Sequence, residues 1–377
     1  MKIKRVEVWH FARQLDGRAW NPAFRWHERH APLLVIECDD GIRGIGEAWS
    51  GYGSVASTLE VLRQEVAPQL LGIEWTDAKD IAALTLGPLA SCGSKAQAAA
   101  WSAADIALWD VTGKVVGQPI WRLLKGTSPL AKVYASGGLY KDNYTLDDLY
   151  NEAQRYRLSG FKAMKMKIAG LARADDISRV TAVLQGLEAD GRLWVDAVNQ
   201  WTLAEATSFL GLLRESGVQA VQSPLAADDI AGLAKLNTEV FPVIAAEAEH
   251  RHETFHQLLE ARAVTYLQFC LPLCGGFSGA AQLDDLAAGY GVSTTPQCFS
   301  TVIAQAATLH FAAARSNVFS AEYHCFHDHL NGLFIADAGK VSHGLANAGD
   351  APGLALSFPN PGPQPDGSVI TCIAKFR

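Results

Sequence analysis

Two lysines separated by a single residue are the most chemically suggestive feature of this 377-residue chain. Residues two apart in a β-strand share a face, so Lys165 and Lys167 are expected to project together. Converging ammonium groups lower each other's pKa, and burial lowers it further, so a lysine there can act as a base near neutral pH. The alternative is a pair of solvated surface lysines.

Three side chains with oxygen donors follow at later predicted strand ends. Asp196, Gln222 and Glu247 can supply three ligands to one hard cation such as Mg2+, leaving other positions to water and substrate. The alternative for each carboxylate is a salt bridge to a nearby lysine. Lysines first, then oxygen ligands on three successive strands, favour a metal-assisted site.

The second part of the chain alternates short apolar strands with amphipathic helices. Strands are expected near Val133, Ala163, Leu193, Val221, Ile244, Leu267, Ser293 and Phe319. Eight strands at intervals of about 25 residues predict a (β/α)8-type barrel rather than an open sheet. Chemistry in such barrels lies at the carboxyl ends of the strands, which here hold Lys165, Lys167, Asp196, Gln222, Glu247, Cys270, Gln297 and Glu322.

The first part of the chain has a different pattern. Segments 2–9, 32–38 and 44–48 alternate like strands of an antiparallel meander, and segment 96–113 has helical periodicity ended by glycine. An α+β domain is therefore expected before the barrel. The Gly- and Pro-rich tail after His343 is expected to wrap back over it.

Composition narrows the range of partners. Acidic residues outnumber basic ones by 39 to 32, which gives a net charge of −7 and no support for a nucleic-acid-binding face. The N-terminus lacks the apolar core of a signal peptide, and no apolar run is long enough to span a bilayer. Seven cysteines without Cys-x-x-Cys spacing indicate reduced thiols. We expect a soluble, cytoplasmic protein with a small-molecule partner.

Several motifs together resemble a known family. They are Asp39-Asp40-Gly41, Gly46-Glu47-Ala48, Asp105-Ile106-Ala107-Leu108-Trp109-Asp110, Pro119-Ile120-Trp121-Arg122, Tyr134-Ala135-Ser136-Gly137-Gly138, Gly160-Phe161-Lys162, Ser223-Pro224-Leu225, Gly275-Gly276 and Pro352-Gly353-Leu354. The chain resembles the enolase superfamily, in the mandelate racemase and muconate lactonizing enzyme branch that includes sugar-acid dehydratases.

This resemblance implies an α/β fold with two domains. An α+β capping domain (1–127), with the tail 346–377 packed back on it, would cover a modified TIM barrel of the (β/α)7β type (128–345). It also implies Mg2+ on three carboxylates, abstraction of a proton α to a substrate carboxylate, and a homo-oligomer. A Lys or His base working with Mg2+ stabilises an ene-diolate in these enzymes.

The family's functional residues match only in part. Lys167 corresponds to the base and Lys165 to its companion, while Asp196 and Glu247 correspond to the first and third metal ligands. Gln222 stands where the family has its second carboxylate ligand, so Mg2+ is expected to bind weakly or not at all.

The residues expected on the opposite face of the site differ more strongly from the family's pattern. The Asp–His dyad of mandelate racemase would fall at Cys270 and Gln297, and glutamine cannot shuttle a proton at neutral pH. Cys270 could act as a thiolate or be a small buried hydrophobe. Glu322 remains as a catalytic candidate on the eighth strand. Asn199 follows Val198, where the family's Asn is expected, and is a candidate substrate-binding residue.

Substitutes for the missing groups lie in nearby loops. Glu249 could replace Glu247 as a ligand. Proton transfer could be restored by the histidines His250, His252, His324, His327 and His329, for which surface or capping roles are the alternative.

The loop between the first two strands is aromatic and basic. Trp20, Trp26 and His27 are expected to contact an anionic substrate, the alternative being that they pack the cap against the barrel.

Two functions remain open at this point. The first is an enzyme that removes the α-proton of a carboxylate substrate, a sugar acid, with Lys167 as base, for dehydration or isomerisation. The second is a degenerate barrel that binds an acid sugar or related anion without turnover.

Overall fold

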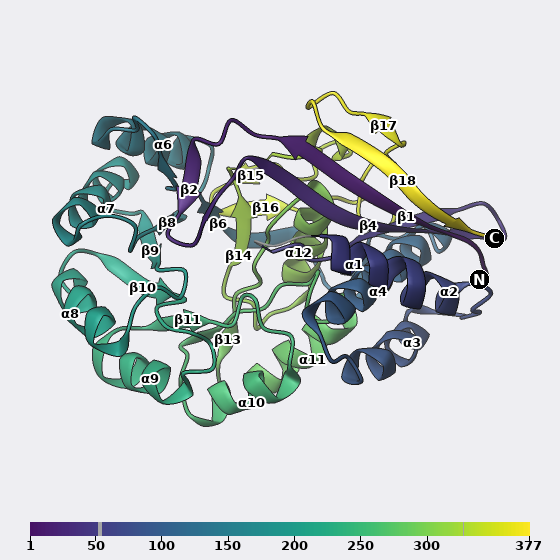
Figure 1. Cartoon of the computed structure of the whole chain (residues 1–377), viewed down its shortest axis with the longest axis horizontal. Coiled ribbons are helices and arrows are strands. Elements are labelled where there is room, and N and C mark those ends of the chain that lie inside the picture. Colours follow the sequence, from purple (N-terminus) through teal and green to yellow (C-terminus); the bar gives the residue numbers. More distant parts are fainter. Residues whose placement is uncertain (52–54, 327) are drawn as a thin grey trace.

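The computed structural model describes residues 1–51, 55–326 and 328–377, which form a capping domain beside a barrel (Figure 1). The strands of the cap sheet run in the order β17-β18-β1-β4-β5. Their bounds are β1 (Ile3–Gln14), β4 (Glu28–Cys38), β5 (Arg43–Glu47), β17 (Gly362–Pro363) and β18 (Val369–Phe376). The cap helices are α1 (Ala56–Val61), α2 (Ala67–Leu70), α3 (Ala78–Ala90) and α4 (Lys95–Val115), with a π-helical turn at Leu62–Val66.

Small residues set the packing of the cap. The helix α4 carries alanines at positions that face β5, and Gly44 and Gly46 of that strand lie against it. A Cβ atom on Gly46 would stand 2.0 Å from the backbone oxygen of Ala103. Strand and helix therefore approach as closely as they do only because the strand has glycine at both positions.

In the described part of the chain, the barrel has eight strands. They are β6 (Leu130–Ser136), β8 (Ala163–Lys167), β9 (Arg192–Asp196), β10 (Val218–Gln222), β11 (Val243–Ala245), β12 (Tyr266–Leu267), β13 (Ser293–Thr294) and β14 (Ala321–His324). From β6 to β13 each pairs in parallel with the next, and β14 pairs in parallel with β6. A parallel bridge between Thr294 and Val318 closes the ring.

Helices alternate with these strands over the described part of the barrel. They are α6 (Leu146–Leu158), α7 (Arg173–Leu187), α8 (Leu203–Leu213), α9 (Ile230–Lys235), α10 (His252–Glu260), α11 (Gly276–Gly289) and α12 (Val302–Ala314). Thr145 and Thr202 begin α6 and α8 with capping boxes. The predicted modified TIM barrel with an α+β cap is confirmed.

Shorter elements complete the chain. They are α5 (Ile120–Leu123), β2 (Ala19–Asn21), β3 (Phe24–Arg25), β7 (Tyr140–Lys141), β15 (Val341–Ser342), β16 (Leu345–Asn347), a 3-10 turn at Asn331–Leu333 and a π-helical turn at Leu236–Val240. In the tail, β16 pairs with β6 of the barrel and β18 pairs with β1 of the cap. No described helix is both long and apolar enough to cross a membrane.

Carboxylates from the cap hold the start of two barrel helices. Glu47, fully buried, accepts hydrogen bonds from the Thr301 hydroxyl at 2.5 Å and from the Ala304 N–H at 3.3 Å, at the start of α12. Asp105 accepts from the Ser278 N–H at 3.2 Å, in the first turn of α11. The cap therefore positions the loops that follow β12 and β13, since those loops lead into these helices.

Candidate active site

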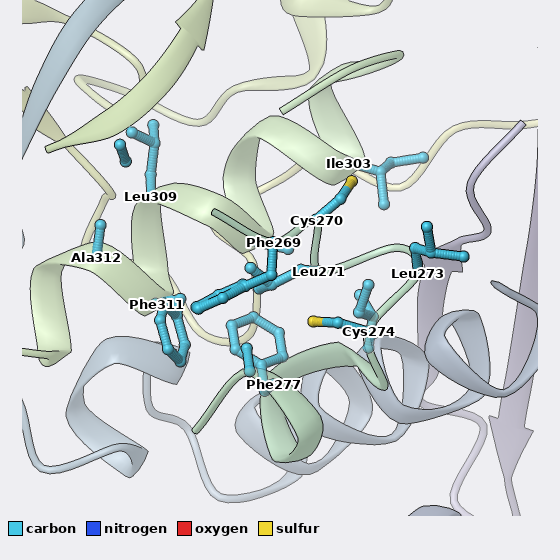
Figure 2. Close-up of a cluster of buried hydrophobic side chains, with 14 of the residues drawn as sticks. Phe269, Cys270, Leu271, Leu273, Cys274, Phe277, Ile303, Leu309, Phe311 and Ala312 are labelled. Atoms are coloured by element: carbon cyan, nitrogen blue, oxygen red, sulfur yellow. The ribbon is translucent and has the colours of Figure 1, made fainter. Parts of the chain in front are cut away.

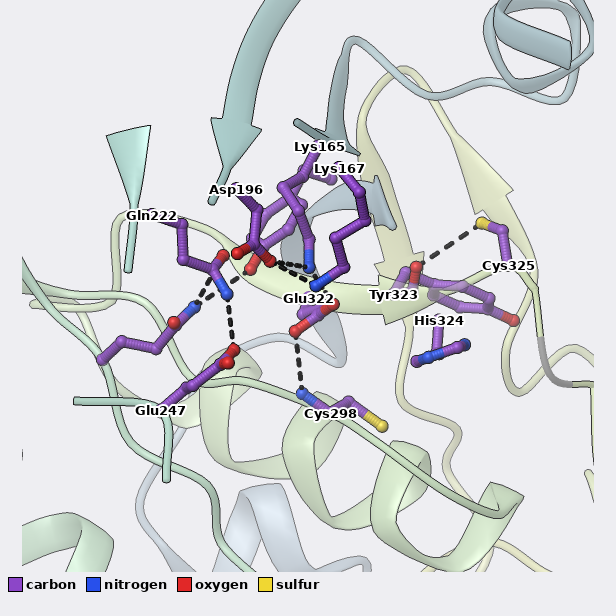
Figure 3. Close-up of polar contacts among 12 residues, drawn as sticks. Lys165, Lys167, Asp196, Gln222, Glu247, Cys298, Glu322, Tyr323, His324 and Cys325 are labelled. Carbon is purple, nitrogen blue, oxygen red and sulfur yellow. Dashed lines mark hydrogen bonds and ion pairs between the residues drawn. The ribbon is translucent and has the colours of Figure 1, made fainter. Parts of the chain in front are cut away.

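Lys165 and Lys167 point from the end of β8 toward Asp196 at the end of β9, as Figure 3 shows. Both ammonium groups contact the same carboxylate oxygen, Oδ2 of Asp196, and that of Lys165 does so at 3.0 Å. Lys165 also contacts Oε1 of Glu322 on β14 at 3.1 Å. The alternation of side chains along β8 thus brings both lysines to the inside of the barrel, as expected from their spacing.

The carboxylates around Lys165 determine its pKa. Burial alone lowers the pKa of Lys165, but Glu322 and Asp196 more than offset this and hold it well above its ordinary value. The prediction that both lysines have lowered pKa values is therefore wrong for Lys165, because two carboxylates contact it. Burial of Asp196 is likewise outweighed by Lys167 and Lys165, which lower the pKa of its carboxyl group.

Side-chain hydrogen bonds that include the amides of Gln222 and Gln268, here called the amide chain, link the ends of the next three strands. Nε2 of Gln222, at the end of β10, donates to Oε2 of Glu247 at 2.5 Å (Figure 3). Oε1 of Gln222 accepts from Nε2 of Gln268 at 3.4 Å, and Gln268 also donates to the hydroxyl of Tyr134 at 3.3 Å. Burial and the negative charge of Asp196 raise the pKa of Glu247 to about 7.

This arrangement does not fit a hard divalent cation on Asp196, Gln222 and Glu247. Such a cation needs convergent oxygens, yet the amide N–H of Gln222 faces Glu247 and two ammonium groups face Asp196. Among the described residues, no group of three or more His, Cys, Asp or Glu side chains is arranged to hold a metal ion.

The opposite side of the site is formed by β13 and β14. Gln297 follows β13 and is 7% exposed, and its Oε1 has no hydrogen-bond partner among the described residues. Glu322 accepts from the Cys298 N–H at 3.4 Å. Burial and the positive charges of Lys165 and Arg29 hold the pKa of His324 well below its ordinary value, so its imidazole is neutral.

Cys270 lies in an apolar cluster rather than against the cavity. Figure 2 shows it among buried side chains that include Phe269, Leu271 and Ile303. Burial raises the pKa of its thiol well above the ordinary value. A thiol in this setting is not ionised at neutral pH, which favours the reading of Cys270 as a small buried hydrophobe over that of a thiolate base.

The lysines, Glu247, Gln297, Glu322 and His324 line one enclosed cavity between barrel and cap. Its roof is largely apolar, with Trp26 of the cap, Leu139 after β6, Phe299 after β13 and Phe326 after β14. The free space is about 30 Å³, enough for a water molecule or two. A sugar-sized molecule therefore requires the roof to move.

Of the four residues proposed for substrate binding, only Trp26 lines this cavity. Trp26 lines the cavity, but Trp20 stacks on Tyr140 with ring centroids 4.4 Å apart, and His27 is exposed. Asn199 is exposed and lines a separate outer cleft of about 480 Å³, which Glu247 also borders.

The substitutes proposed in the loops are also placed apart from the lysines, except His324. Glu249 accepts from the guanidinium of Arg251 at 2.8 and 3.1 Å and from two backbone N–H groups, which outweigh burial and lower its pKa. His250 lines the outer cleft, His252 begins α10, and His329 contacts Arg13 of the cap. His327 lies outside the described residues.

Sequence reasoning missed Gln268 and Tyr134, which complete the amide chain. Gln268 directly follows β12 and shares the spacing of two with Cys270, so the period of the strand could have identified it. Tyr134 lies inside β6, where an apolar run gives no sign that its hydroxyl meets a polar group.

Comparison with known proteins gives two family matches that together span most of the chain. The model "Mandelate racemase / muconate lactonizing enzyme, N-terminal domain" matches residues 25–125. The model "Enolase C-terminal domain-like" matches residues 148–360.

Individual relatives agree with these matches. D-galactarolactone cycloisomerase of Agrobacterium fabrum is 30% identical over 95% of this chain and 97% of its own length. Arabinonate dehydratase of Saccharolobus solfataricus is 28% identical over 88% of this chain and 89% of its own. The crystal structure of a racemase from Streptomyces coelicolor with bound magnesium has a TM-score of 0.84 at 25% identity, covering 94% of this chain and 97% of that one. The chain therefore belongs to the enolase superfamily, in the branch of mandelate racemase and muconate lactonizing enzyme.

Proposed function

We propose that this protein removes the proton next to the carbonyl carbon of a small sugar-derived acid, free or as its lactone, with Lys167 as the base. Dehydration or isomerisation would follow from that step. The observation that carries the proposal is the pair Lys165 and Lys167, buried at the floor of an enclosed cavity at the carboxyl ends of the barrel strands. Relatives named for a sugar-acid lactone and for arabinonate support the substrate class.

The two lysines have separate roles in this proposal. The pKa of Lys165 is raised, because Glu322 and Asp196 outweigh its burial, so it remains a fixed ammonium ion that can face a developing negative charge. Lys167 also lines the cavity and contacts only one carboxylate, Asp196, among the ion pairs of the described residues. Because Lys165 is held by two carboxylates, we assign the role of base to Lys167.

Binding without turnover is the second candidate, and three replacements favour it. Gln222 takes the place of a carboxylate, Gln297 cannot transfer a proton, and Cys270 is enclosed by apolar side chains. A general acid or base typically contributes about 10² to 10⁴ in rate, so loss of the dyad alone removes much of the catalytic power of the opposite face.

Exchange of the α-hydrogen for deuterium tests the enzyme proposal against the binding proposal. The protein is incubated in D2O with a panel of sugar acids and their lactones, and the α-proton signal is followed by NMR. We expect exchange with one stereochemical series and a loss of at least about 10² in rate for Lys167→Met.

A matched control is Lys162→Met, which removes an exposed lysine that pairs with Asp190 at 2.6 Å outside the cavity and should leave exchange unchanged. Equal exchange by Lys167→Met and wild type contradicts Lys167 as base. Tight binding of a panel member without any exchange supports the second candidate instead.

A further inference from the structure

The charged groups in and beside the cavity carry no excess positive charge. Its charged lining residues are Lys165, Lys167, Glu247 and Glu322, and Asp196 lies directly against the two lysines. With every group ionised, two positive charges face three negative ones. If Lys167 is to accept a proton it must begin neutral, and one positive charge then faces three negative ones. Such a cavity does not attract a further carboxylate.

Donor groups of the protein already face the oxygens that would bind a metal ion. The amide of Gln222 donates to Glu247 at 2.5 Å and accepts from Gln268 at 3.4 Å, so both ends of this amide are engaged. Oδ2 of Asp196 receives both lysine ammonium groups. These contacts disfavour a cation bound by all three side chains, because an N–H donor faces Glu247 and two ammonium groups face Asp196.

Building on the function proposed above, we propose that this site works without a divalent metal ion and enolises an uncharged carbonyl group, that of a lactone or ester, rather than an ionised carboxylate. The α-C–H bond breaks, the proton passes to the neutral amine of Lys167, and the electron pair leaves one negative charge on the carbonyl oxygen. The ammonium of Lys165 faces this charge, and Lys167 becomes an ammonium ion as it takes the proton, so the net charge of the occupied site does not change. An ionised carboxylate would add one further negative charge to a site in which negative groups already outnumber positive ones.

The remaining lining fits a hydroxylated but uncharged molecule. Oε1 of Gln297 has no hydrogen-bond partner among the described residues, is buried, and borders the cavity, so it can accept from a ligand hydroxyl. The apolar roof formed by Trp26, Leu139, Phe299 and Phe326 would strip water from a carboxylate without replacing its hydrogen bonds.

Metal binding tests the first half of this inference without reference to activity. Calorimetric titrations with MgCl2 and with MnCl2 are compared for the wild type and Gln222→Glu, after thermal unfolding shows that the variant folds. We expect no heat of binding to the wild type at millimolar metal and at least tenfold tighter binding to the variant. Wild-type affinity equal to or tighter than that of Gln222→Glu overturns the inference.

Exchange in D2O tests the second half on the chelator-treated wild type, so that no variant is needed. Lactones of several sugar acids and the sodium salts of the same acids are compared, each with EDTA and with MgCl2. We expect exchange of the lactone α-hydrogen at the same rate under both conditions, at least tenfold faster than in the salts. Exchange of the salts that requires MgCl2 overturns the inference but leaves the proposed function standing. Absence of exchange in every compound contradicts the proposed function, and the titrations then still decide whether metal binds.

Discussion

At the scale of single residues, the presence of glutamine instead of glutamate at position 222 decides how the site meets a metal ion. Glutamate at position 222 would place another negative charge beside Asp196 and Glu247, and glutamine places an N–H donor there, 2.5 Å from Glu247. A unit charge pair 4 Å apart is worth about 4 kcal/mol at an effective dielectric of 20. That is enough to change affinity for a dication by orders of magnitude.

The state of Cys270 can be tested by two substitutions of similar size. Cys270→Ala should lower the free energy of unfolding by about 1 kcal/mol, because it leaves a small cavity among Phe269, Leu271 and Ile303. Cys270→Ser should cost about 1 to 3 kcal/mol, because it buries a hydroxyl among apolar side chains. Urea denaturation measures both.

Neither Cys270 variant should change the rate of α-hydrogen exchange by more than about twofold, since the thiol does not border the cavity. A loss of exchange in both variants that retain their fold would identify the thiol as part of the chemistry and contradict this placement.

At the scale of elements, the alternation of strands and helices could be predicted because most barrel strands are short and contain apolar residues, and a helix follows each described strand from β6 to β13. The strand ends Lys165, Lys167, Asp196 and Gln222 follow directly from that pattern. The direction of the pKa shift at Lys165 could not be predicted, because it depends on how closely Glu322 and Asp196 approach its ammonium group, and the spacing of residues along the chain does not give those distances.

The residues that form the cavity roof also could not be predicted from the sequence. Leu139, Phe299 and Phe326 come from three different loops, and apolar residues in loops have no period that marks them. Trp20 and Trp26 are indistinguishable by type and differ only in where the cap loop folds: one stacks on Tyr140 and the other closes the cavity.

The contact between the cap and α12 yields a prediction at this scale. Glu47→Ala should lower the free energy of unfolding by about 1 to 3 kcal/mol, because it leaves the Thr301 hydroxyl and the Ala304 N–H without their buried acceptor. Glu47→Gln keeps one acceptor oxygen and should lose less. Burial raises the pKa of Glu47, so loss of its charge is tolerated better than loss of its oxygen.

Denaturation by urea at neutral pH measures both Glu47 variants. The control is Glu74→Ala, which removes an exposed carboxylate paired with Lys2 and should change stability by less than about 0.5 kcal/mol. A Glu47→Ala protein as stable as the control would show that the cap does not support α12.

At the scale of the whole molecule, buried histidine links stability to pH. His310 on α12 accepts the Trp121 N–H of α5 at 3.2 Å, and burial lowers its pKa to about 4. The unfolded chain takes up this proton near pH 6.5, so the stabilisation present above that pH is lost as pH falls toward 4. At 1.4 kcal/mol per pH unit the loss amounts to about 3 kcal/mol.

This contribution is measured by urea denaturation of the wild type and of His310→Gln. The free energies of unfolding are compared at pH 7.0 and pH 4.5. The variant keeps an acceptor and cannot titrate, so its stability should fall less over the same interval. Parallel decreases in the two proteins would mean that His310 does not contribute to acid sensitivity.

The cap and the barrel enclose a cavity with room for little more than water. The charged side chains at this cavity form ion pairs with one another. Crystals grown in the presence of MnCl2 test this central claim most directly, through an anomalous difference map. We predict no manganese peak between Asp196, Gln222 and Glu247, with the Gln222 amide within hydrogen-bond distance of Glu247. A manganese peak coordinated by oxygens of all three side chains, with the lysines withdrawn from Asp196, would contradict the account.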